Sequence, residues 1–94
     1  MEDLKKKLAW YRSTTRKALE KIAVMDGTDK REREKAKMLL DMANNYFSDA
    51  EHFEKKGLLL TALAAYSYAH AWLDAGVRLG ILDGKNDDRL FTLP

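Results

Sequence analysis

Apolar side chains recur along the chain in alternating steps of three and four residues, the period of a helix that buries one face. Three segments carry this pattern, at about residues 2–25, 29–56 and 58–80. Gly27 and Gly57 separate them, and glycine readily adopts the left-handed conformation that closes a helix. Because the second break leaves almost no loop, the helices on either side of it should form an antiparallel hairpin. The sequence predicts an all-α, antiparallel three-helix bundle that forms one domain over residues 1–94.

The third segment is apolar around most of its circumference. Its polar side chains form one narrow strip, in which the spacing is i, i+3, i+7 and i+11: Ser67, His70, Asp74 and Arg78. Its apolar arc is about twice the width that an ordinary surface helix carries, and it includes Trp72. We therefore expect this helix to be enclosed on more than one side, with Trp72 in the core. Since two helices and a short tail leave part of that arc uncovered, a homodimer is one expectation.

The C-terminal residues combine a turn with apolar side chains. Residues 83–88, Asp-Gly-Lys-Asn-Asp-Asp, are typical of a turn, and Leu90, Phe91 and Leu93 follow it. These side chains need cover. The tail is predicted to pack back on the bundle, and docking on a second subunit is the alternative.

Composition narrows the classes of protein that remain. The chain has no cysteine, which excludes disulfides, a thiolate nucleophile and a cysteine-based zinc site and fits a cytoplasmic location. The first ten residues are charged and lack the apolar core of a signal peptide. His70 and Asp74 interrupt the most apolar helix, which argues against a membrane span.

Positive charge is concentrated in the N-terminal part of the chain. Residues 1–37 hold twelve Lys and Arg against seven Asp and Glu, whereas residues 38–94 hold five against eight, so the two parts carry +5 and −3. Trp10 lies about 120° from the apolar seam of its helix, among Lys6, Lys7, Lys17 and Lys21. An aromatic ring among basic side chains is typical of surfaces that bind single-stranded nucleic acid, and also of interface anchors. Alternatively, Trp10 packs at the edge of the bundle under lysine stems.

No catalytic or metal-binding pattern stands out. His52 and His70 lie on different helices, and no H-x-x-x-H or E-x-x-H ligand pair is present, so no metal or cofactor is predicted. His70 is expected to be a structural histidine that is hydrogen-bonded to a neighbour. Asp74 and Arg78, four residues apart, are expected to form an ion pair.

Several short motifs in the second half of the chain carry a family resemblance: Asp49-Ala50, Phe53, Lys56-Gly57, Ala62 to Ala65, Tyr68-Ala69, Trp72-Leu73-Asp74-Ala75-Gly76 and Leu79-Gly80. With them the chain resembles an archaeal helical family known as domain of unknown function 357. The resemblance implies a three-helix bundle, an archaeal cytoplasmic protein and no assigned activity. Leu58 departs from the acidic cap expected at that position.

These observations favour a non-enzymatic protein-interaction or assembly module with an unidentified protein partner. The candidate interaction surface is Trp10 with Lys6, Lys17 and Lys21, and the polar strip of the third helix is a second group of interest. The alternative is an RNA- or DNA-binding accessory protein that uses the basic face of the first helix, which is the less favoured of the two.

Overall fold

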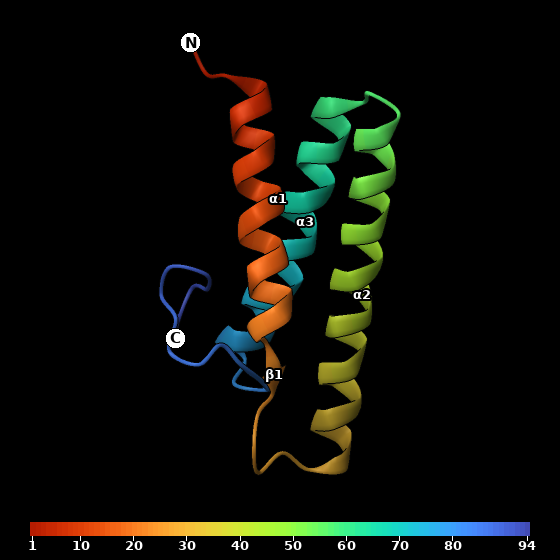
Figure 1. Cartoon of the computed structure of the whole chain (residues 1–94). Helices are drawn as coiled ribbons and strands as arrows, with labels where there is room; N and C mark the ends of the chain where they lie inside the picture. Colours follow the sequence, from red (N-terminus) through yellow and green to blue (C-terminus); the bar gives the residue numbers. More distant parts are fainter.

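The computed structural model describes residues 1–94 and contains three helices and one pair of short strands (Figure 1). The elements in chain order are α1 (Leu4–Lys21), β1 (Ala23–Val24), α2 (Lys30–Lys55), α3 (Leu59–Arg78) and β2 (Leu82–Asp83). The prediction of an all-α three-helix bundle is confirmed, and the strands are an addition to it.

Local chemistry explains where the helices begin and turn. Asp3 accepts a hydrogen bond from the Lys6 amide at the start of α1. At the start of α2, Asp29 and Glu32 form a capping box, with each side chain accepting from the other residue's amide. Gly57, at φ +78°, makes the tight turn into α3. Leu58 caps α3 without any side-chain hydrogen bond, so that helix start depends on packing.

α3 is the central element of the bundle. It packs along both α1 and α2, whereas α1 and α2 touch each other little. Figure 1 shows α1 and α2 side by side with α3 behind them, and the C-terminal tail beside the lower half of α1. One side of α3 therefore faces away from both other helices.

The first helix is shorter than predicted. α1 ends at Lys21, because Ile22 turns to an extended conformation at φ −60° and ψ 144°. Residues 23–24 then pair antiparallel with β2, in the register Ala23 with Asp83 and Val24 with Leu82. The apolar residues keep a helical spacing through Met25, but residues 23–24 form a strand because they pair with β2.

The core has two parts that share α3. One includes Leu8, Phe47 and Tyr66 toward the hairpin end of α2 and α3. The other contains Leu39, Leu73, Val77, Leu82 and Phe91 beside the strand pair. Since Leu82 and Phe91 are almost fully buried there, the prediction that the tail packs back on the bundle is confirmed.

Gly76 lies against the aliphatic side chain of Leu82, and a Cβ at position 76 would lie 2.5 Å from its Cγ. The expectation that Trp72 lies in the core needs adjustment. Trp72 is only partly buried, at the edge of the core, and its indole N–H has no hydrogen-bond partner. None of the helices combines the length and the hydropathy that crossing a membrane requires.

Candidate functional site

The polar strip of α3 binds the C-terminal tail. The Nε2 of His70 hydrogen-bonds the carbonyl of Leu90. Asp74 Oδ1 accepts from the Thr92 amide at 2.9 Å, and Arg78 donates to the Leu93 carbonyl at 2.9 Å. Asp74 and Arg78 each bind the tail and make no ion pair with one another, so that predicted pair is wrong. Ser67 is exposed and takes no part.

Both ring nitrogens of His70 are occupied. A carbonyl oxygen only accepts, so Nε2 carries the proton shared with Leu90. In the neutral ring Nδ1 then accepts from the hydroxyl of Thr15, 3.0 Å away, which is fully buried on α1. Asp74 lies on the Nε2 side, with 4.0 Å between Nε2 and Oδ1. The imidazole thus joins α1, α3 and the tail, and it presents no free nitrogen to a substrate or a metal ion.

A second group of contacts closes the tail onto α1. Lys21 Nζ lies 2.7 Å from Asp87 Oδ2, and the amides of Arg89 and Leu90 donate to Asp87 Oδ1. The hydrogen bond from Lys21, followed by those from the backbone, holds the pKa of Asp87 below its usual range. Lys21 is therefore engaged inside the molecule.

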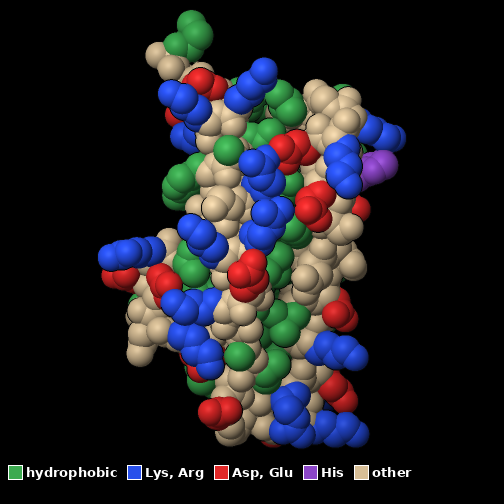
Figure 2. Space-filling view, viewed as in Figure 1, with side chains coloured by type: hydrophobic (Ala, Val, Ile, Leu, Met, Phe, Trp, Pro, Cys, Tyr) green, Lys and Arg blue, Asp and Glu red, His purple; other side chains and the backbone are tan.

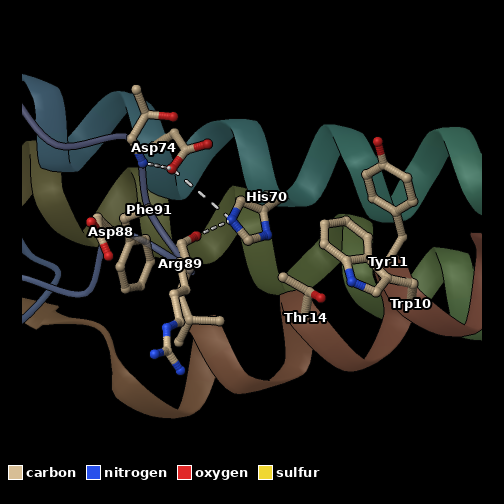
Figure 3. Close-up of a pocket in the computed structure, with 10 residues that line it drawn as sticks. Trp10, Tyr11, Thr14, His70, Asp74, Asp88, Arg89 and Phe91 are labelled. Atoms are coloured by element: carbon tan, nitrogen blue, oxygen red, sulfur yellow. Dashed lines mark hydrogen bonds and ion pairs between the residues drawn. The ribbon is translucent and has the colours of Figure 1, made fainter.

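Trp10 lies at the mouth of a cleft between α1, α3 and the tail (Figure 3). The cleft has a volume of about 220 Å³, and Trp10, Tyr11, Thr14, His70, Asp74 and residues 88–92 line it. The indole is 59% exposed and meets the ring of Tyr11 edge-on, with 5.0 Å between the centroids. Lys17 and Arg89 line an adjoining hollow that Trp10 also borders. Of the predicted interaction residues, the structure brings together Trp10 and Lys17.

Much of the positive charge on α1 is paired. Lys7 pairs with Glu2, and Arg12 and Arg16 reach across to Glu54 and Glu51 on α2. Figure 2 shows basic and acidic side chains interspersed over α1 and α2 on the face turned to the viewer. Lys6 and Lys17 are exposed and make no ion pair. The charges of +5 and −3 on the two parts of the sequence thus partly neutralise each other, because basic side chains of α1 pair with acidic side chains of α2.

Tyr66 anchors a polar network across the three helices. Its ring is fully buried, and its hydroxyl donates to Glu54 Oε1 at 2.8 Å while Arg12 binds the other oxygen of the same carboxylate. Burial, and then the hydrogen bond to Glu54, raise the pKa of Tyr66 far above its ordinary value. The network links the three helices and has a structural role, because the phenol is held in its neutral form.

Tyr66→Phe tests this role, because the difference in unfolding free energy between wild type and variant should depend on pH. Near pH 8 the variant loses one hydrogen bond to a carboxylate, about 1.5–3 kcal/mol of unfolding free energy. Above pH 10 unfolded chains release the phenol proton that the native state retains, so stability falls as pH rises, by up to about 1.4 kcal/mol per pH unit for this group. Urea unfolding at about pH 8 and about pH 11 should show the wild-type advantage shrinking. An advantage that stays constant or grows would contradict this assignment.

An unpartnered apolar surface lies on the side of α3 that faces away from α1 and α2. Its exposed apolar members, which we call the outer surface of α3, are Leu60, Ala64, Tyr68, Ala71, Ala75 and Leu79, and the polar side chains of Thr61, Ser67 and Arg78 are exposed beside them. Leu60 and Leu79 are each 69% exposed, and Tyr68 is 49% exposed. None of the six is charged, so this surface gains little from contact with water.

A groove between α2 and α3 extends this outer surface. It measures about 390 Å³ and is lined by Tyr46, Asp49, Phe53, Thr61, Ala64, Ala65 and Tyr68. Tyr68 meets Tyr46 edge-on at 4.4 Å on one side and Trp72 at 5.9 Å on the other. The aromatic rings thus form a continuous row from α2 to α3.

These residues were not predicted as a site from the sequence. The apolar arc of the third helix is visibly too wide there, but the pattern does not separate the part that α1, α2 and the tail cover from the part that they leave exposed. The signal that marks the remainder is a second apolar series at steps of three and four residues, from Leu60 to Leu79, on the side opposite Ala62, Tyr66 and Ala69.

These features define a class of protein: a small helical bundle with an open apolar helix surface. No group of three or more His, Asp or Glu side chains lies close enough together to hold a metal ion. The chain belongs to the family described as Protein of unknown function (DUF357), whose model matches residues 10–82. The resemblance found in the second half of the sequence is thereby confirmed. Neither the curated proteins nor the solved structures contain a match to the chain.

Proposed function

We propose that the protein is a non-enzymatic interaction module that binds a protein partner on the outer surface of α3. The observation that carries the proposal is the exposure of Leu60, Tyr68 and Leu79 on the helix that organises the whole core. Exposed apolar patches with an aromatic centre and a polar border are typical of protein-binding sites.

The remaining polar groups support a role without catalysis. His70, Asp74 and Arg78 bind the tail, and Glu54 and Tyr66 bind one another. A catalytic base needs a ring nitrogen or carboxylate within reach of a substrate proton. These groups already have intramolecular partners, so the apolar surface is the feature left for a function.

Photo-crosslinking tests this proposal directly. A benzophenone amino acid placed at Tyr68 should form covalent protein adducts on irradiation, in the purified protein or in lysate of the native host. The matched control places the same group at Lys37, nine residues from Tyr46 and so on the opposite side of α2. Protein adducts from position 68 but not from position 37 are expected. Equal or absent labelling at the two positions would overturn the proposal.

A nucleic-acid role is the second candidate, and the exposed ring of Trp10 beside Lys17 and Arg89 favours it. Stacking on the indole would contribute about 1–3 kcal/mol per base, and lysine contacts to phosphate would make affinity fall with salt. Against it stands the pairing of Lys7 and Lys21 with acidic side chains inside the molecule.

Trp72→Phe supplies a background in which Trp10 is the only tryptophan. Because the Trp72 indole N–H has no partner, this change breaks no hydrogen bond. If the nucleic-acid role holds, single-stranded oligonucleotides should quench Trp10, Trp10→Ala should weaken binding by about 1–3 kcal/mol, and Lys17→Ala should flatten the salt dependence. Absence of quenching at low salt and tens of micromolar oligonucleotide would exclude this role.

A further inference from the structure

The six positions of the outer surface of α3 are spaced symmetrically along the helix, and the two outer pairs carry the same residue type. Its members lie at positions 60, 64, 68, 71, 75 and 79, which are symmetric about the midpoint of the helix between Ala69 and His70. Leucine stands at both ends and alanine stands at both 64 and 75, while Tyr68 and Ala71 flank the centre. In a two-fold interface each residue meets the residue at the mirrored position of the second copy, so such a surface must be complementary to itself. Here leucine would meet leucine at the ends, and the large ring of Tyr68 would meet the small side chain of Ala71 near the centre.

We propose that the occupant of this surface is a second copy of the chain, docked with its α3 antiparallel across a two-fold axis at that midpoint. This inference rests on the proposed function and names its partner. The axis places Ala64 level with Ala75 of the second copy, and Tyr68 level with Ala71 of the second copy. A large ring thus meets a methyl group at the centre of each half.

The helix geometry allows these residues to meet. At about 100° per residue, Ala64 and Ala75 lie within about 20° of each other around α3, so both point toward the same flank of a two-fold pair. Positions 60, 64 and 68 form one row at steps of four, and 71, 75 and 79 form the neighbouring row. Rows of this kind interdigitate when two helices cross, and small residues allow axes to approach to about 8 Å.

The length of α3 sets the size of the contact. α3 has 20 residues, about 30 Å at 1.5 Å per residue. A helix with its side chains is about 10 Å across, so contact along α3 alone covers about 300 Å² per copy, about half of the roughly 600 Å² that the lower limit for specific stable interfaces requires. The second copy therefore also has to cover the groove that Tyr46 and Phe53 line beside Tyr68.

Electrostatics do not oppose the pairing. The six residues include no Lys, Arg, Asp or Glu, and Arg78 at the border is directed to the Leu93 carbonyl. Each copy carries a formal net charge of +2, which is small. Two such surfaces therefore meet without the like-charge repulsion that commonly keeps monomers apart.

Disulfide formation between cysteine variants tests the arrangement, since the chain itself contains no cysteine. An equimolar mixture of Ala64→Cys and Ala75→Cys is oxidised, and each variant is also oxidised alone. A disulfide needs Cα atoms within about 7 Å. In the antiparallel pair the two copies of position 64 lie about 16 Å apart along the helix, so neither variant should couple to itself. Lys37→Cys, on the far side of α2, is the matched control.

The mixture is expected to give at least tenfold more covalent dimer than either variant oxidised alone. The control variant should give no covalent dimer. Melting curves of the variants should match wild type, because both alanines are exposed. Self-coupling of Ala64→Cys would overturn the antiparallel arrangement. An uncoupled mixture would overturn the second copy as partner, while the proposed function would still stand if position 68 labels another protein.

Discussion

Phe91→Ala is expected to lower the free energy of unfolding by about 3–5 kcal/mol, as truncation of buried aromatic rings does. Phe91 is 3% exposed, although only three residues follow it in the sequence. Its ring packs in the same cluster as Leu73, Val77 and Leu82, so it fills the core beside the strand pair. A Cβ at Gly84 would also lie 3.1 Å from its Cγ, so the turn before it fits closely against the ring.

Chemical denaturation of Phe91→Ala and Thr92→Ala measures this effect with a matched neighbour. Thr92 is exposed, and its amide keeps the bond to Asp74 in the variant, so its replacement should cost less than about 0.5 kcal/mol. A loss below about 1 kcal/mol for Phe91→Ala would mean that the tail is an attachment on the surface and not part of the core.

The contact between Gly76 and Leu82 should give the second large effect. Leu82→Ala empties a fully buried position and should cost about 2–5 kcal/mol. Gly76→Ala places a methyl group 2.5 Å from Leu82 Cγ and should cost about 1–3 kcal/mol, despite the helix propensity of alanine. In the double variant the new methyl group enters space that Leu82 has vacated.

A double-mutant cycle by urea unfolding therefore should be strongly non-additive. The double variant is expected to be at least about 1 kcal/mol more stable than the sum of the two single losses predicts. Losses that add within about 0.3–0.5 kcal/mol would contradict this, because they would show that a side chain at position 76 does not clash with Leu82.

Local patterns predicted the helices well because their signals are local. The turn at Gly57 is decided by residues within one helical turn, and it appears as expected. The end of α1 was missed because Val24 pairs with Leu82, more than fifty residues away in the chain. A two-residue strand carries no period that a sequence pattern can detect.

The polar strip of α3 is visible in the sequence, but its hydrogen bonds to the C-terminal tail could not be predicted. Spacing alone made Asp74 and Arg78 a plausible pair, since side chains four residues apart can meet. The tail offered backbone partners instead, and those contacts depend on where residues 90–93 return in space. In the same way, the sequence places Lys21 with the other basic residues of α1, but the structure pairs it with Asp87 of the tail.

The outer surface of α3 is the reverse case, because the excess of apolar residues is visible in the sequence and only the structure shows which of them remain uncovered. Two helices, a strand pair and the tail cover the residues from Ala62 to Val77 that face inward. The series from Leu60 to Leu79 stays in solvent. The proposed pairing therefore depends on whether a second copy of the chain covers that series.

Sedimentation equilibrium of the full chain over a dilution series tests this most directly. The wild-type mass should rise from 10.8 kDa toward twice that value between about 1 and 100 μM, the range expected for a micromolar dissociation constant. Ala71→Glu, which places two carboxylates at the centre of the pair, should remain at 10.8 kDa throughout. A wild-type chain that stays at 10.8 kDa at the highest concentration, or a dimer that Ala71→Glu leaves intact, would contradict the account.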